Sequence, residues 1–182
     1  MHLHAPQYAM LGLGMDVPLL EWLQRYTYPV EARFADAGYA REVFERLAQA
    51  LIANGTTRVC IFSSLHTDAT LLLMEALERA GVTGYAGKVN MDRNGGDGLQ
   101  ETTAESQRET LRWLDACDRF SRVRPMLTPR FVPSCTDALL AFLGRLSRER
   151  KLPVQSHLSE NREEMALVRR LHPDCEQYWQ VY

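Results

Sequence analysis

The feature that most constrains the fold is an alternation between short apolar segments and longer segments with helical periodicity. Between residues 37 and 52 the apolar side chains recur about every four positions, which places them on one face of a helix. Asn54-Gly55 is typical of a helix end, and residues 58–62 follow as an apolar, β-branched strand. Strands that alternate with helices pair in parallel and are covered by those helices. The pattern therefore predicts an α/β protein built on a parallel sheet.

The same strand–helix unit recurs along the rest of the chain. Further strands are expected at residues 85–91, 123–128 and 152–158, with a half-strand at residues 1–4. The residues that suit helix N-caps are Thr67 or Asp68, Thr102 with Glu105 in a capping box, Thr136, and Ser159. Four full strands fall short of the eight in a closed (β/α)8 barrel of about 250 residues. The prediction is therefore either an open α/β sheet or part of such a barrel.

Composition and charge exclude several classes of partner. The 182 residues suit one domain, and a net charge of −2 predicts no attraction to nucleic acid or to a membrane surface. No apolar run approaches the ~18 residues needed to span a bilayer. The four cysteines are too far apart for a paired zinc-binding motif. Without a secretory leader or a disulfide pattern, we expect a cytoplasmic protein.

His2 and His4 form the first candidate for metal binding. Alternate residues of a strand point to the same side, so two imidazoles with this spacing can reach one metal ion. By itself the H-x-H spacing is more simply a chance pair near an initiating methionine.

His157 and Glu160 form the next candidate. His157 lies at the carboxyl end of the strand expected at residues 152–158, where α/β proteins bind their ligands. Glu160 follows at the expected start of a helix, where a carboxylate can move protons near a metal without being a ligand. Taken alone, His157 also suits a packed loop position, and Glu160 suits the charge preference of a helix N-terminus.

Gln7, Arg130 and Phe131 supply groups that suit a planar, polar ligand. An arginine offers forked donors to acceptor atoms on one edge of a purine, and a phenylalanine can cover a ring face. The Gln7 amide both donates and accepts. Each has an ordinary structural explanation, but all fall near strand ends that a parallel sheet brings to one edge. His66 also follows a strand and would face the same edge, and we expect it to lead a helix or to support the site without touching the ligand.

Several longer segments resemble the guanine deaminases, a family within the metal-dependent amidohydrolase superfamily. The more specific segments are Leu19-Leu-Glu-Trp-Leu23 and Thr128-Pro-Arg-Phe131, with further likeness in His2-Leu-His-Ala-Pro-Gln-Tyr8, Gly87-Lys-Val-Asn-Met-Asp92 and Gln155-Ser-His-Leu-Ser-Glu-Asn-Arg162. The resemblance runs from end to end of the chain. It implies an incomplete (β/α)8 TIM-type barrel with about four to five of the eight units. It further implies that residues 1–182 are a single partial barrel domain without the family's N-terminal β-domain and C-terminal barrel strands.

The resemblance also implies a reaction and a role for each candidate residue. The reaction is the zinc-dependent hydrolytic deamination of guanine to xanthine and ammonia, a step of purine catabolism, in an enzyme that is a homodimer when intact. The implied roles are Zn²⁺ binding for His2, His4 and His157, guanine binding for Gln7, Arg130 and Phe131, and proton transfer for Glu160.

Two features of the family have no counterpart in the chain. They are a further histidine after the next strand, and an aspartate at the end of the eighth strand that binds zinc and orients the attacking water. We therefore expect residues 1–182 alone to be inactive or nearly so. Two alternatives stay open: another amidohydrolase-type deaminase or chlorohydrolase, and a truncated, non-catalytic fragment or pseudoenzyme. The cytidine-deaminase fold is set aside, because neither H-x-E nor P-C-x-x-C occurs.

Overall fold

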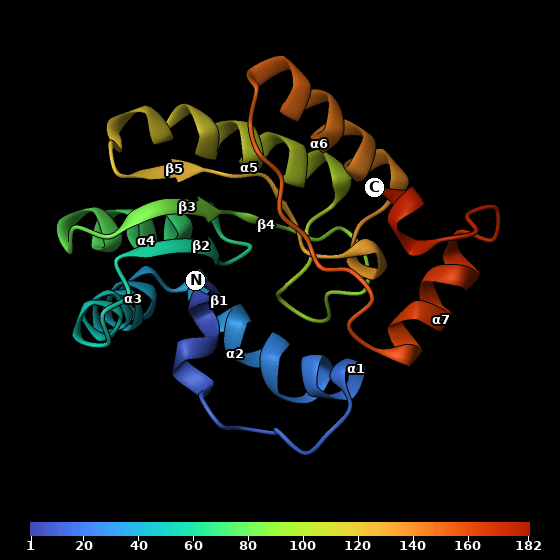
Figure 1. Cartoon of the computed structure of the whole chain (residues 1–182), viewed down its shortest axis with the longest axis horizontal. Helices are drawn as coiled ribbons and strands as arrows, with labels where there is room; N and C mark the ends of the chain where they lie inside the picture. The colour runs from blue at the N-terminus through green and yellow to red at the C-terminus, as the bar shows by residue number, and fades with distance from the viewer.

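A four-stranded parallel sheet forms the centre of the molecule. The computed structural model describes residues 1–182, and the strand order is β1 (His2–His4), β2 (Arg58–Phe62), β3 (Thr83–Gly87) and β5 (Val123–Pro125). A second parallel pair, β4 (Val89–Asn90) with β6 (Thr128–Pro129), continues from β3 and β5. Figure 1 shows β1, β2, β3 and β5 side by side. The parallel α/β architecture expected from the sequence is confirmed.

Long helices connect the strands and pack against one another along one side of the sheet. They are α3 (Ala37–Ala53), α4 (Thr67–Arg79), α5 (Thr103–Asp115) and α6 (Asp137–Arg150), which contact each other in chain order (Figure 1). Thr102 with Glu105 and Thr136 cap their helices as expected. The main core lies between these helices and the sheet, with Phe44, Leu73 and Trp113 fully enclosed. None of these helices combines the length and the hydrophobicity that a transmembrane segment needs.

A short helical segment after β1 lies at the carboxyl ends of the strands. It runs through α1 (Leu19–Trp22), a π-helical stretch (Leu23–Thr27) and α2 (Tyr28–Ala32). A smaller apolar cluster joins this segment to the strand ends and includes Leu23, Tyr28, Phe62 and Phe131. This cluster fixes α1 and α2 against the carboxyl ends of the strands.

The strands expected at 85–91 and 123–128 are each divided in two. β3 pairs with β2 and β5, whereas β4 pairs only with β6. Pro125 stands at the end of β5 and carries no N–H, so it cannot donate to the ladder between β5 and β3.

The strand expected at 152–158 is not regular, and this prediction was wrong in detail. The segment pairs with its neighbour at one bridge, Leu127 with Val154, where Gln155 N donates to Leu127 O at 2.9 Å. No strand lies along its other edge. The Gln155 side chain instead donates to Ile61 O and to Thr128 Oγ1.

The last helix also begins later than expected. α7 spans Arg162–Leu171, and its N-cap is Asn161, whose side chain accepts from Glu163 N at 2.8 Å. Ser159 adopts a left-handed conformation with φ of 57° and caps nothing. Glu160 therefore lies in a loop before α7.

Candidate metal centre

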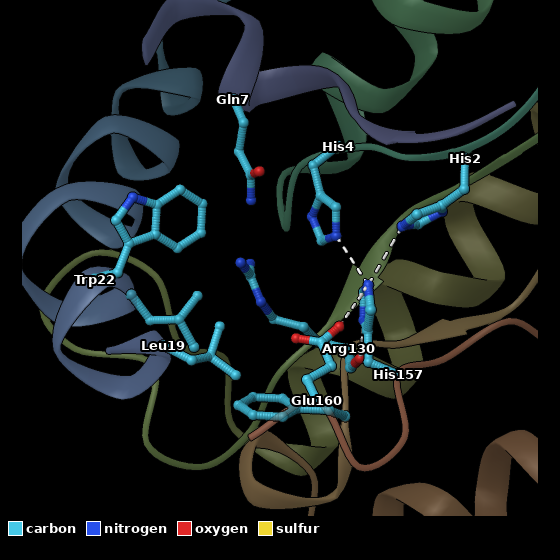
Figure 2. A pocket seen from close by; sticks show the side chains of 10 residues that line it. His2, His4, Gln7, Leu19, Trp22, Arg130, His157 and Glu160 are labelled. Atoms are coloured by element: carbon cyan, nitrogen blue, oxygen red, sulfur yellow. Dashed lines mark hydrogen bonds and ion pairs between the residues drawn. The ribbon is translucent and has the colours of Figure 1, made fainter. Parts of the chain in front are cut away.

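Three imidazoles converge at the carboxyl end of the sheet. His157 Nε2 lies 3.1 Å from His4 Nε2 and 3.3 Å from His2 Nε2. The donor atoms of all three lie within 4.8 Å of one another. Figure 2 shows His2 and His4 reaching from β1 toward His157, which comes from the loop before α7. The parallel sheet thus brings together side chains more than 150 positions apart in the sequence.

The spacing of the three nitrogens fits a metal ion. Nitrogens bound to one tetrahedral zinc at about 2.0–2.1 Å lie about 3.3 Å apart, which matches the two shortest separations. The pKa of His4 is lowered well below its ordinary value by burial and then by the nearby Arg130 charge. The pKa of His2 is lowered by burial and by His157. Both effects keep the imidazoles neutral, which is the form that binds metals.

Contacts behind His157 fix the orientation of its ring. Its Nδ1 lies 2.9 Å from Arg130 O, so Nδ1–H donates to that carbonyl and leaves the Nε2 lone pair facing the other imidazoles. Tyr182 Oη donates to His157 O at 2.7 Å. Glu160 stands beside the cluster, with Oε1 3.6 Å from His157 Nε2, and its side chain is 39% exposed. The carboxylate can therefore reach both solvent and a ligand next to the histidines.

A cavity of about 270 Å³ opens directly beside the histidines. Its apolar lining comes from Leu19, Trp22, Leu23 and Phe131. Figure 2 shows Gln7 and Arg130 reaching into it beside Trp22 and Leu19. The cavity thus combines flat apolar surfaces with polar groups at one end, a combination that suits a planar heterocycle.

Glu31 is a buried residue of this site that the sequence did not reveal. Its carboxylate accepts from both terminal nitrogens of Arg130 and, through Oε1, from Gln7 Nε2 at 3.3 Å. The side chains of Glu31 and Arg130 are only 2% and 3% exposed. The one local signal is that Glu31 is the only charged residue between Arg25 and Arg33.

His66 and His172 do not join the cluster. His66 directly precedes α4 and lines a separate hollow with Glu101 and Glu109. His172 ends α7, with Nδ1 3.7 Å from Asp137 Oδ1. The structure therefore separates these two histidines from the three that converge.

Comparisons with known proteins identify the family to which the chain belongs. The model of the amidohydrolase family matches residues 1–179. Guanine deaminase from Mus musculus is 44% identical over the whole chain, and that from Escherichia coli K12 is 36% identical. The crystal structure of guanine deaminase from C. acetobutylicum with bound guanine superimposes with a TM-score of 0.97 at 48% identity. The chain covers 40%, 41% and 43% of these three proteins, respectively. A family match over almost every residue, together with these relatives, shows that the chain belongs to the amidohydrolase family.

Proposed function

We propose that the chain contributes the metal-binding and guanine-binding part of a zinc-dependent guanine deaminase. The observation that carries the proposal is the convergence of His2, His4 and His157 beside a cavity whose polar end holds Arg130 and Gln7. The similarity to guanine deaminases over the whole chain supports guanine as the substrate. We extend the proposal to a role in cytoplasmic purine catabolism and to a homodimeric intact enzyme on the strength of that relationship.

The proposed reaction replaces the 2-amino group of guanine by oxygen. Water adds its oxygen to C2, the bond from C2 to the amino nitrogen breaks, and the products are xanthine and ammonia. Zinc held by the three histidines would supply an activated water at neutral pH. Glu160, which lies beside His157, would protonate ring N3 and then carry a proton to the departing amine.

The other pocket residues would hold the ring in place. Arg130 would donate to the acceptor atoms O6 and N7, and Gln7 would hydrogen-bond the ring edge. Phe131 would cover a face of the ring, with Leu19 and Trp22 adding apolar contact. This arrangement would leave C2 to be placed next to the histidines.

The proposal is tested by zinc uptake and by complementation. Purified chain 1–182 is expected to bind zinc but to form little or no xanthine alone. Adding the part of the C. acetobutylicum enzyme that lies beyond the matched region is expected to produce guanine-dependent xanthine. A chain that takes up no zinc, or a complemented mixture that takes up zinc and forms no xanthine, would contradict the proposal.

A further inference from the structure

Glu31 connects the two polar residues at the end of the cavity. Its Oε1 accepts from both Arg130 Nη2, at 3.1 Å, and Gln7 Nε2, at 3.3 Å, and its Oε2 accepts from Arg130 Nη1. Glu31 sits on α2, whereas Arg130 directly follows β6 and Gln7 follows β1. One carboxylate therefore sets the position of two side chains from different parts of the chain.

The contact with Glu31 dictates which way the Gln7 amide faces. An ionised carboxylate only accepts hydrogen bonds, so the NH₂ group of Gln7 must point toward Glu31. Gln7 Oε1 is then left free, and Figure 2 shows it turned toward His4 while Nε2 points toward Arg130. A ligand in the cavity consequently meets an acceptor at Gln7.

The same contact limits what Arg130 can offer. Part of the guanidinium is committed to Glu31, and its Cζ atom lies over the Tyr28 ring, 5.1 Å from the ring centre. Arginine has donors only, so the N–H groups left over can bind only acceptor atoms of a ligand. Its positive charge is balanced by Glu31, so the pocket demands no negative charge on the ligand.

We propose that Glu31 is a positioning residue that sets substrate specificity by presenting one acceptor, Gln7 Oε1, beside the donors of Arg130. This polarity selects purines whose six-membered ring offers an N–H next to a carbonyl oxygen. Guanine carries that pattern at N1 and O6. 2,6-Diaminopurine carries the inverse pattern, a ring acceptor next to an amino donor, although it has the same 2-amino group. The inference rests on the proposed function, because it assumes that the cavity holds guanine.

The test compares Glu31→Gln with a variant of the other buried ion pair. Glu31→Gln gives the side chain a donor as well as an acceptor, so the Gln7 amide is free to turn over. The control is Glu101→Gln, because Glu101 pairs at 2.9 Å with Lys88, which is 0% exposed. Both substitutions remove one carboxylate from a buried pair, but only Glu31 contacts Gln7 and Arg130.

Binding of radiolabelled guanine and of 2,6-diaminopurine is measured by equilibrium dialysis on zinc-loaded chain 1–182, alone and with the complementing polypeptide. On the complemented form, the kcat/KM for guanine is also divided by the kcat/KM for 2,6-diaminopurine. Glu31→Gln is expected to reduce the preference for guanine at least tenfold, whereas Glu101→Gln changes it less than twofold. An unchanged preference in Glu31→Gln, or an equal loss in Glu101→Gln, would overturn the inference while leaving the proposed function intact. Unaltered protein that binds no guanine in either form would overturn both.

A charge exchange keeps the test decisive where Glu31→Gln folds poorly. In the double variant Gln7→Glu with Glu31→Gln, the carboxylate moves to position 7 and again accepts from its amide neighbour. It is expected to recover an acceptor facing the ligand and to restore at least part of the guanine preference. A refolded double variant that shows no preference at all would count against the inference.

Discussion

Arg130 and Glu31 form a buried ion pair with two contacts, and each side chain is almost fully enclosed. Removing one member of such a pair leaves the other charge buried without a partner, which costs about 3–5 kcal/mol. We therefore expect Arg130→Met to lower the free energy of unfolding by that amount, in addition to weakening guanine binding more than zinc uptake. Denaturant unfolding measures the loss of stability, and guanine binding and zinc content of the same preparations measure the other effect.

The double variant Arg130→Met with Glu31→Gln separates the two effects. Without a buried charge, most of the lost stability is expected to return, because a neutral pair carries a smaller desolvation penalty. Guanine binding is expected to stay weak. A double variant that is no more stable than Arg130→Met would show that the destabilisation comes from something other than an unpaired Glu31.

Zinc affinity is expected to depend on His157 and not on His172. His157→Ala removes one of three converging imidazoles, so the zinc dissociation constant should rise more than about 100-fold, beyond the 10- to 100-fold typical of residues that only support a ligand. His172→Ala is the matched control, because His172 lies at the end of α7 outside the cluster. Competition with a chelator gives both constants. Equal losses in the two variants would argue against the assigned metal centre.

Glu164 is expected to affect the reaction through the loop that carries Glu160. The Glu164 carboxylate is fully buried and accepts from Glu160 N at 2.7 Å, from Asn161 N and from Tyr178 Oη. Glu164→Gln replaces a charged acceptor by a neutral amide, which weakens the bonds from Glu160 N and Asn161 N and should cost about 1–3 kcal/mol. In the complemented enzyme kcat should fall about tenfold or more, with zinc affinity little changed. Glu163→Gln, on the exposed side of the same helix, should change neither quantity.

The sequence predicted the parts of the fold and site that depend on local pattern. Helical periodicity and capping residues such as Thr102 and Thr136 identified helices that the structure confirms. Histidines at strand ends were placed on one edge because a parallel sheet aligns those ends. Glu31 could not be found this way, because its role arises from Arg130, 99 positions away. A regular strand at 152–158 was the wrong prediction, because an apolar run does not show whether partner strands lie on both of its edges. The segment forms a single bridge, between Leu127 and Val154.

Gly87 is required where β3 passes close to the start of β6. A Cβ atom at this position would lie 1.7 Å from Thr128 Oγ1 and 2.4 Å from Met126 O. Gly87→Ala should therefore destabilise the protein by about 1–3 kcal/mol or more through overpacking. Gly144→Ala is the opposite control, because Gly144 lies inside α6 with its nearest contact at 3.7 Å. That change should stabilise by about 0.5–1 kcal/mol. Thermal unfolding midpoints that shift in the same direction for both variants would refute this explanation.

Glu78 is expected to make stability depend on pH in the acidic range. Partial burial raises the pKa of Glu78, but hydrogen bonds from Ser121 Oγ and from the N–H groups of residues 121–123 outweigh that effect and hold the pKa below its ordinary value of 4.5. A carboxyl group with a depressed pKa in the folded state contributes stability above its unfolded pKa and loses it as the pH falls through the folded value.

Glu78→Gln should consequently lower the free energy of unfolding by about 1–3 kcal/mol at neutral pH, because the carboxylate bonds that join the end of α4 to the start of β5 are weakened. The difference in unfolding free energy between the variant and the unaltered protein should narrow as the pH falls below about 4.5. Glu78 of the unaltered protein then becomes protonated and loses its charge as well. Urea unfolding at pH values from about 7 down to about 3 measures the gap directly. Glu75→Gln on the same helix is a suitable control, because Glu75 bonds one arginine side chain, Arg119, rather than a row of backbone N–H groups. A gap that stays constant over the whole range would show that the charge on Glu78 is not what stabilises this junction.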